Sequence, residues 1–296
     1  MFMPREFHLC LAGQSFLYKD IFCDKITATE KGLPHKEAVF MVICIDVGNT
    51  DMVAGIFCNE QLTDTVRFAY SKGASVQEYL DLLTASLTEK VDFAQVKGCL
   101  VCCVAQNTLA NLAQAMEQLF GCKPVIFRND DRCRLEIKTE DPQEVGTDII
   151  ASCMAAKEKY PMPCVVVDMG TATTLTAMDK NGDVLGVSIL PGVFISMWAL
   201  RERTGLPFDD DITVCPAPIG TNTQKSVDSG IILGNAYAVD GLAAAFEKQM
   251  NQGRCTVVAT GGASQFIVRH CTRDVVLNNN LLLEGLYCYY KNSIIN

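Results

Sequence analysis

Two apolar runs along the chain end in the same short polar pattern. Residues 42–50 read VICIDVGNT, and residues 164–173 read CVVVDMGTAT. A run of mostly β-branched residues that stops at Asp-x-Gly predicts a buried strand entering a tight turn, where the Gly lets backbone N–H groups approach an anion. Two such hairpins in one chain predict a duplicated fold that closes on a nucleotide phosphate.

Helical and strand periodicities extend the first hairpin into an α/β unit. Ser75 and Glu78 form a capping box, which predicts a helix whose apolar face spans 76–87. We expect Thr108 to cap a second helix that stops at Gly121. The other elements predicted here are strands at 51–57, 61–68, 99–104 and 124–127 and a helix at 148–159.

The second half of the chain repeats this order of elements. Pro161 and Pro163 mark the junction between the halves, and the second hairpin turns at 181–182. Its predicted elements are strands at 164–179, 184–189, 256–259 and 275–276, helices at 195–203 and 281–291, and a long helix that follows residues 219–223 and runs to about 250. We therefore expect an N-terminal α/β half at 41–160 and a C-terminal α/β half at 161–296, facing each other across a cleft.

Residues 1–40 lack a clear periodicity. His8, Gln14 and Ser15 interrupt their apolar stretch, which argues against a signal peptide. Met41 then begins directly on the first predicted strand. We expect the natural start at Met41, with residues 1–40 as a non-native or disordered extension.

Composition limits the partners and compartments that fit this chain. The formal net charge is −9 and no Lys- and Arg-rich run is present, which disfavours nucleic-acid binding. No apolar stretch approaches the ~18 residues of a membrane span, so we expect a soluble protein. Most of the 15 cysteines lie in apolar runs, including Cys99 and Cys102 of a CxxC pair. We interpret them as reduced thiols of a cytoplasmic protein rather than as metal ligands.

The first hairpin turn offers donors for the β- and γ-phosphates of a nucleotide. Gly48, Asn49 and Thr50 supply backbone and side-chain donors beside Asp46, whose carboxylate suits a Mg²⁺ ion held through water. The second turn repeats this arrangement, with a threonine-rich run after Asp168. Phosphoryl transfer needs positioning, charge neutralisation and a base for the incoming hydroxyl, and this chain offers candidates for each.

Two further motifs stand at predicted helix starts. Gly261 and Gly262 permit a flat base or ribose to approach the backbone. Gly146, Thr147 and Asp148 open another helix. For that motif alone, simple N-capping by Asp148 is the alternative interpretation.

Taken in chain order, these motifs resemble the type III pantothenate kinases of bacteria, which are members of the acetate kinase/sugar kinase/Hsp70/actin superfamily. The resemblance spans roughly residues 41–292. Its matching segments are 45–50, 142–148, 166–173, 190–192, 206–207, 219–223, 229–230, 239–242, 259–262 and 283–286. It implies a duplicated ribonuclease H-like (actin-like ATPase) α/β fold, with two α/β halves around a nucleotide cleft.

The resemblance also implies an activity. The expected reaction is ATP-dependent phosphorylation of pantothenate to 4'-phosphopantothenate, the first step of coenzyme A biosynthesis, in a homodimer with substrate sites at the subunit interface. Asp148 corresponds to the general base and, with Asp46, makes up the expected catalytic pair. Asp168 corresponds to the residue that binds an activating K⁺ or NH₄⁺ ion.

The remaining expected site residues fall into two groups. The ATP-binding group is Asp46, Val47, Gly48, Asn49, Thr50, Asp51, Met52, Val53, Thr171, Gly261 and Gly262. The substrate-binding group is Gly146, Thr147, Asp148, Ile149, Thr223 and Thr139.

Two departures from the family pattern concern the substrate side. Ile149 stands where Arg is usual, and Thr139 stands where Tyr is usual. Losing a charge-assisted hydrogen bond costs about 1.5–3 kcal/mol, or roughly ten- to a hundredfold in affinity. Lys138 and Arg134 are candidates to hold the pantothenate carboxylate instead.

These departures leave two alternatives open. One is a kinase of the same fold that acts on another small alcohol, which the two substitutions favour. The other is a non-catalytic, nucleotide-binding regulatory paralogue, against which Asp46, Asp148 and Asp168 argue. Smaller departures are Gln106 where Pro is usual and Thr147 where Ala is usual.

Overall fold

The computed structural model describes residues 40–48, 51–103 and 105–295. The predicted extension over residues 1–40 lies outside the described residues apart from Phe40. Two predicted phosphate-binding residues, Asn49 and Thr50, also lie outside them.

The first half of the chain forms a five-stranded mixed sheet with helices. Its strands are β1 (Met41–Val47), β2 (Asp51–Cys58), β3 (Gln61–Ala69), β4 (Val96–Cys103) and β5 (Val125–Ile126). Its helices are α1 (Val76–Leu87), α2 (Gln106–Phe120) and α3 (Thr147–Lys159), with short 3₁₀ turns at Phe93–Gln95, Asp131–Cys133 and Pro142–Glu144. The strand order is β3-β2-β1-β4-β5, with β1 antiparallel to β2 and parallel to β4.

The second half builds another five-stranded sheet. Its strands are β6 (Cys164–Met169), β7 (Ala172–Met178), β8 (Val184–Pro191), β9 (Thr256–Thr260) and β10 (Val276–Leu277). Its helical segments are α4 (Val193–Thr204), α5 (Thr223–Asp228), a π-helical turn η4 (Ser229–Leu233), α6 (Gly234–Met250), α7 (Ser264–Ile267), a 3₁₀ turn (Val268–His270) and α8 (Leu281–Ile295). The strand order is β10-β9-β6-β7-β8, with β6 antiparallel to β7 and parallel to β9.

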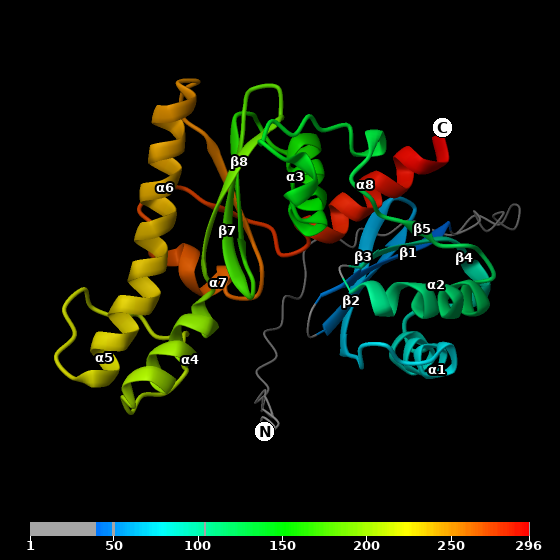
Figure 1. Cartoon of the computed structure of the whole chain (residues 1–296), viewed down its shortest axis with the longest axis horizontal. Helices are drawn as coiled ribbons and strands as arrows, with labels where there is room; N and C mark the ends of the chain where they lie inside the picture. Colours follow the sequence, from blue (N-terminus) through cyan, green and yellow to red (C-terminus); the bar gives the residue numbers. More distant parts are fainter. Residues whose placement is uncertain (1–39, 49–50, 104, 296) are drawn as a thin grey trace, which may run out of the picture. The chain divides into compact units, whose positions relative to one another are not determined.

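Both sheets therefore share one topology. In each, three antiparallel strands join two parallel strands through the first strand of the hairpin (Figure 1). This repeat is the duplicated ribonuclease H-like fold of the actin-like ATPases, and it confirms the predicted fold class. The domain boundary at residue 160 stays a prediction, because α3 also contacts β6 and α8 contacts β1 and β4.

Local signals explain where the helices on the first sheet begin and end. The capping box is confirmed, since the Ser75 hydroxyl accepts from the Glu78 amide and the Glu78 carboxylate accepts from the Ser75 amide. Gly121 ends α2 in the left-handed conformation with φ 68°. The predicted cap at Thr108 is wrong, because α2 begins two residues earlier and the Thr108 hydroxyl is buried, accepting from Tyr79 Oη.

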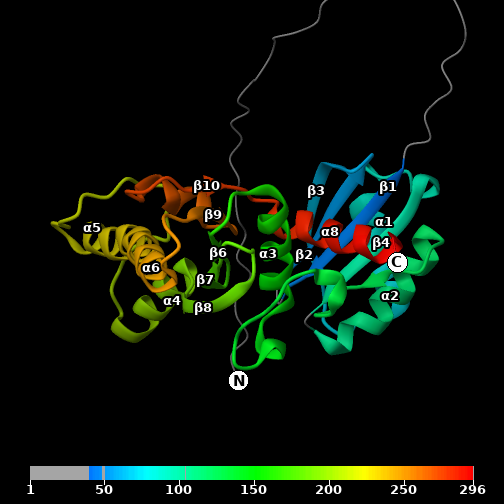
Figure 2. The ribbon, with the colours of Figure 1, turned by 90° about the horizontal axis from the view of Figure 1, so that it is seen from above.

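Helices α3 and α8 lie between the two sheets (Figure 2). Ile150 and Met154 pack in the cluster formed by α8 and the first sheet, whereas Cys153 and Ala156 pack against the second sheet. A helix that is apolar on both sides is stable only when both sides are covered. The two helices also approach closely, because a Cβ at Gly285 would collide with the backbone of α3. The start of α3 is thereby held relative to both sheets.

The segment Thr223–Met250 is a long, apolar helical rod. Among the described residues it is the one helix with the length and composition of a membrane span, with a mean hydropathy of 1.2 over its best 18-residue window. The expectation that no apolar stretch approaches the length of a membrane span is therefore wrong as far as length and composition are concerned. The helix nevertheless packs against the second sheet through its buried face. Only 28% of that window is buried, so much of its apolar surface faces outward.

Candidate active site

The turn between β1 and β2 is the first predicted phosphate loop. Its backbone closes through a hydrogen bond from the Gly48 amide to the Asp51 carbonyl (3.0 Å). Tyr70 Oη donates to the carbonyl oxygen of Gly48 (2.7 Å), and Arg67 pairs with the Asp51 carboxylate (3.1 Å). These contacts from the end of β3 support the loop from one side.

The side chains that flank this turn have structural roles. Val47 and Met52 are buried in the core between the first sheet and its helices. Val53 is partly buried against the opposite face of the sheet. Any contact of Val47 or Met52 with ATP must therefore use the backbone, and the ATP contacts of all three residues stay a prediction.

The turn between β6 and β7 repeats this design. The Gly170 amide donates to the Ala172 carbonyl (3.0 Å), and Thr171 is exposed at the tip. Gly192, which begins α4, packs so tightly on the carbonyls of this turn that a Cβ there would collide with them. Thr173 is buried and its hydroxyl has no hydrogen-bond partner among the described residues. The turn thus has an exposed residue, Thr171, at its tip and next to it a buried hydroxyl, that of Thr173, without a hydrogen-bond partner among the described residues.

The Gly-rich turn after β9 lies directly against Asp168. Gly261 has φ +90°, a conformation that L side chains rarely adopt, and a Cβ there would lie 2.5 Å from Asp168 Oδ1. The Ala263 amide donates to the Met169 carbonyl (3.2 Å), which fixes this turn on the end of β6. Gly262 is exposed beside it. A side chain at position 261 would therefore displace Asp168.

Three aspartates from three elements interact electrostatically. Burial, followed by repulsion from Asp148 and Asp168, raises the pKa of Asp46 to about 7, although Arg67 lowers it slightly. Burial and repulsion from Asp148 raise the pKa of Asp168 to about 6. Concentrated negative charge in a partly desolvated place disfavours ionisation of each carboxyl group. A bound cation relieves that repulsion, so the donor chemistry fits the metal ions that the sequence predicts.

Asp148 is exposed in the first turn of α3. The residue at the N-cap is Gly146, and none of the described side chains caps this helix, so the N-capping alternative for Asp148 is wrong. A Cβ on Gly146 would collide with Asp148 Oδ1, so the glycine leaves space for the carboxylate. Thr147 lies beside it and contacts the Cys102 thiol across 3.4 Å.

The substrate-side departures have clear structural settings. Ile149 packs against the core between α3 and the second sheet, as an apolar residue is expected to do. The Thr139 hydroxyl is buried without a hydrogen-bond partner among the described residues. Lys138 is already engaged by Asp179 (3.1 Å) and Asp183 (2.8 Å). It is therefore a poor candidate to hold a substrate carboxylate, whereas Arg134 is exposed.

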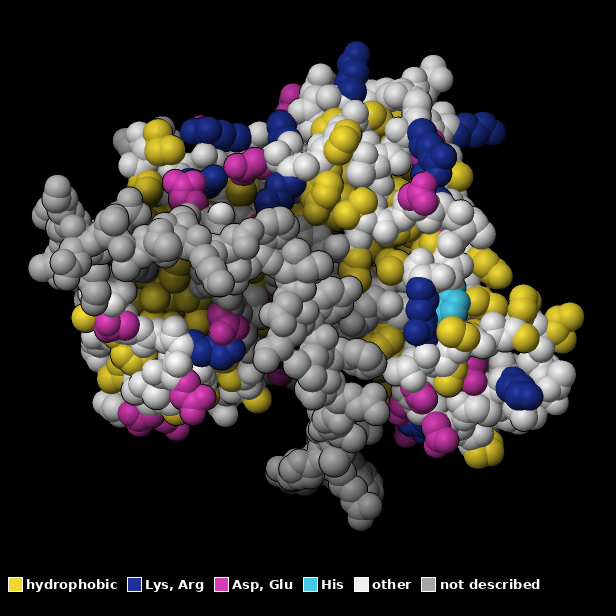
Figure 3. Space-filling view, turned by 180° about the vertical axis from the view of Figure 1, so that it is seen from behind, with side chains coloured by type: hydrophobic (Ala, Val, Ile, Leu, Met, Phe, Trp, Pro, Cys, Tyr) yellow, Lys and Arg dark blue, Asp and Glu magenta, His cyan; other side chains and the backbone are white. Residues whose placement is uncertain are grey.

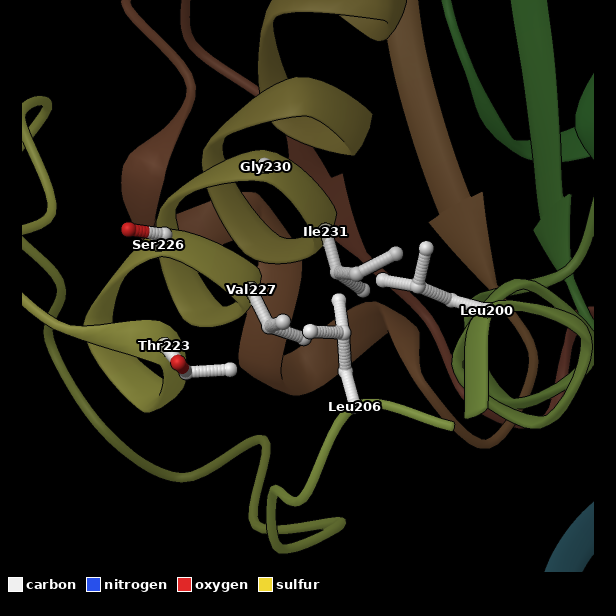
Figure 4. Close-up of a pocket in the computed structure, with 7 residues that line it drawn as sticks. All are labelled: Leu200, Leu206, Thr223, Ser226, Val227, Gly230 and Ile231. Atoms are coloured by element: carbon white, nitrogen blue, oxygen red, sulfur yellow. The ribbon is translucent and has the colours of Figure 1, made fainter. Parts of the chain in front are cut away.

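Thr223 lies apart from these groups, in a pocket of about 440 Å³ beside α4 and α5 (Figure 4). Leu200, Leu206, Val227 and Ile231 make most of its wall, and their side chains point toward one another in Figure 4. None of the three aspartates lines this pocket. The apolar wall suits a hydrocarbon group and does not suit phosphate.

Sequence reasoning missed three residues at this site. Tyr70, Arg67 and Cys102 touch the predicted groups through side chains from neighbouring strands. The available signal was register: Cys102 pairs with Asp46 in the parallel ladder of β1 and β4. When the strand register is not known, a cysteine in an apolar run is predicted to be an ordinary core residue.

The fold and this site define a class, the ATP-dependent phosphotransferases with an actin-like fold. A sequence model of the type III pantothenate kinase family matches residues 42–266. A curated type III pantothenate kinase from Exiguobacterium sp. strain AT1b is 32% identical over 253 residues, which is 85% of this chain and 98% of that protein. The chain belongs to the type III pantothenate kinase family.

A solved structure is also similar in fold. The crystal structure of a Campylobacter jejuni protein, described as a conserved Baf family transcriptional activator, matches with a TM-score of 0.56 and 16% identity. The match covers 86% of this chain and 100% of that chain. At this identity the similarity concerns the fold alone.

The raised pKa of Asp46 makes a prediction for the stability of the ligand-free protein. The cost of burying the ionised carboxylate is absent below its ordinary pKa of 3.8 and complete above about 7. We expect Asp46→Asn to be about 4 kcal/mol more stable than the wild type at pH 8 and close to it in stability near pH 4. Urea unfolding in chelator at both pH values measures this.

A control of opposite sign is Asp64→Asn. Lys90 lowers the pKa of the exposed Asp64 carboxyl, so its removal should destabilise the protein at pH 8, and this loss should diminish as the pH falls below the ordinary Asp pKa. A stability gain in Asp46→Asn that does not change with pH would contradict the electrostatic account.

Proposed function

We propose that this chain transfers the γ-phosphoryl group of ATP to the hydroxyl of pantothenate, with Asp148 as the base. As a member of the type III pantothenate kinase family, the chain is an ATP-dependent kinase of pantothenate in coenzyme A biosynthesis. The observation that supports the role of Asp148 is its electrostatic repulsion of both Asp46 and Asp168. Repulsion of this kind acts between nearby charges, which is consistent with a base next to the glycine-rich turns.

Asp148 accepts the proton of the substrate hydroxyl as the new phosphorus–oxygen bond forms. The hydroxyl oxygen attacks the γ-phosphorus, the bond to the β-phosphate oxygen breaks, and ADP leaves. A base with this task needs position first, and a carboxylate that is exposed at a rigid helix start supplies it. Because no cap consumes its oxygens, Asp148 is available to the substrate.

Asp46 and the loop around Gly48 hold the phosphates. Mg²⁺, when bound, neutralises the phosphate charge, and it commonly binds through one carboxylate, water and the phosphates themselves. Among the described residues no group of three His, Cys, Asp or Glu side chains is arranged to hold a metal. Asp46 alone, acting through water, is therefore the ligand that we assign.

Asp168 is the residue that we assign to a monovalent cation, K⁺ or NH₄⁺. Its partly buried carboxylate lies against Gly261, and burial followed by repulsion from Asp148 raises its pKa. Such a cation supplies that compensation next to the nucleotide. Gly261 and Gly262 then offer backbone to the nucleoside, and Thr171 to a phosphate.

The pantothenate carboxylate has no partner at position 149. Ile149 packs into apolar core, and Lys138 is occupied by two aspartates. These observations also favour the second candidate, a kinase of the same fold that acts on another small alcohol. The unpartnered Thr139 hydroxyl gives either substrate a hydrogen-bonding group.

We further propose that the active form is a cytoplasmic homodimer. Apolar side chains are exposed around the Thr223 pocket, and in the view of Figure 3 hydrophobic side chains reach the surface over the half built on the second sheet. We call this surface the α4–α6 face; its exposed residues are Phe194, Ile195, Trp198, Leu206 and Tyr237. All 13 described cysteines are free, as in a reducing compartment.

A second copy on the α4–α6 face accounts for the position of Thr223. Within one chain, Thr223 shares no lining residue with the aspartates. A substrate site between subunits allows Thr223 of one copy to complete the site of the other. Exposed apolar patches of this kind mark interaction surfaces.

The Asp148→Asn variant tests the base. It should bind ATP with unchanged affinity and lose at least about 100-fold in kcat, because it keeps the shape of the side chain and removes its proton acceptor. A coupled assay of ADP release with pantothenate, Mg²⁺ and K⁺ measures kcat, with Asp64→Asn as the surface control. Turnover close to that of the wild type would reject the role.

The Ile149→Arg variant tests the pocket. A guanidinium there should lower the KM for pantothenate by about tenfold or more, since it restores a charge-assisted hydrogen bond to the carboxylate. Ile149→Gln is the control for size without charge. If folded Ile149→Arg leaves KM unchanged, another group already holds the carboxylate.

The Trp198→Glu variant tests the dimer. Trp198 is 64% exposed on the α4–α6 face, so a buried charge there should dissociate the dimer and lower turnover. Val276→Glu is the control, because Val276 is an exposed apolar residue on β10, outside that face. Sedimentation velocity measures the oligomeric state of both variants, and the coupled assay measures their turnover. A wild-type monomer with full activity would contradict the proposal.

A further inference from the structure

Cys102 is a buried thiol that the reaction described above does not use. It lies near the end of β4, directly beside Asp46 in the parallel ladder, and only 1% of its surface is exposed. Its neighbour Cys103 faces the other way and contacts the Ala105 carbonyl (3.2 Å). Adjacent strand residues point to opposite faces, so Cys102 alone is directed at the candidate active site.

The thiol links two catalytic elements. Its sulfur donates to Thr147 Oγ1 across 3.4 Å, and its register partner in the parallel ladder is Asp46. A thiol carries one proton, but its sulfur also accepts. The contact with Thr147 can therefore form whichever of the two groups provides the proton.

The start of α3 has no side-chain cap to hold it. Gly146 occupies the N-cap position without a side chain, and the first intrahelical hydrogen bond there runs from the Ile150 amide to the Gly146 carbonyl. The contact from Cys102 to Thr147 is therefore the hydrogen bond that ties the first helical residue to β4. Asp148 is the next residue along the chain.

We propose that Cys102 is a positioning residue for phosphoryl transfer, which holds Thr147, and through it Asp148, at a fixed place relative to Asp46. This inference rests on the proposed function for its effect on turnover. A purely structural role would instead make Cys102 an ordinary apolar residue of the core, replaceable by any side chain of similar size.

Substitutions at Cys102 separate the two roles. Cys102→Ala should lower kcat about tenfold with the KM for ATP within twofold, because the base is displaced while nucleotide binding persists. Cys102→Ser keeps a donor and an acceptor and should retain kcat within about threefold. Cys153→Ala, a buried thiol on α3 away from the site, should lose stability similarly and keep kcat.

A double-mutant cycle tests whether the contact itself matters. Thr147→Val removes the hydroxyl and keeps the shape, so the pair with Cys102→Ala should cost little more in kcat than either single change. Multiplicative losses would overturn the proposal, as would a Cys102→Ala enzyme with wild-type kcat or a Cys102→Ser enzyme as slow as Cys102→Ala.

Amide hydrogen exchange gives a readout that needs no substrate. In Cys102→Ala the Ile150 amide should exchange several-fold faster than in the wild type, whereas in Cys153→Ala it should not. Unchanged exchange at Ile150 would overturn the positioning role. If the wild type fails to phosphorylate pantothenate, the proposed function fails while this exchange test of Cys102 still stands.

Discussion

The packing of α3 between two sheets is the constraint on which the site depends. One side of the helix belongs to the core of the first sheet and α8, and the other to the core of the second sheet. A helix held on both sides cannot rotate without opening one of these cores. The packing of the helix therefore limits where its start can lie, and the contact of Thr147 with Cys102 ties that start, next to Asp148, to β4. The close approach of Gly285 to Ala151 reinforces this, since no side chain separates the two helices there.

Charge is the second ordering principle of the site. Asp46 and Asp168 end equivalent strands of the two halves, so duplication of the fold also duplicates the carboxylates. Their raised pKa values show that the protein holds these groups against both desolvation and mutual repulsion. A cation that bound to these carboxylates in the folded chain and not in the unfolded chain would stabilise the fold.

The sequence allowed the fold to be predicted well, because its signals are local. The capping box at Ser75 and the stop at Gly121 depend on a few neighbouring residues, and both occur as predicted. The predicted cap at Thr108 is wrong because the Thr108 hydroxyl accepts a hydrogen bond from Tyr79, which is distant in the sequence. At the site, motif order located the three aspartates that interact. Motif order could not identify Cys102, because its position beside Asp46 depends on the strand register. It also could not show that Thr223 lines a pocket that none of the three aspartates lines.

The clamp at Lys138 has a consequence for ligand affinity. Its two ion pairs and the bridge between Ile137 and Val184 attach the segment before Thr139 to the second sheet. Ordering a loose loop around a ligand consumes part of the binding energy as lost conformational entropy. Here contacts within the chain itself already fix that segment. A substrate that reaches Thr139 therefore meets a preorganised wall, and its contacts there contribute to affinity without that entropic cost.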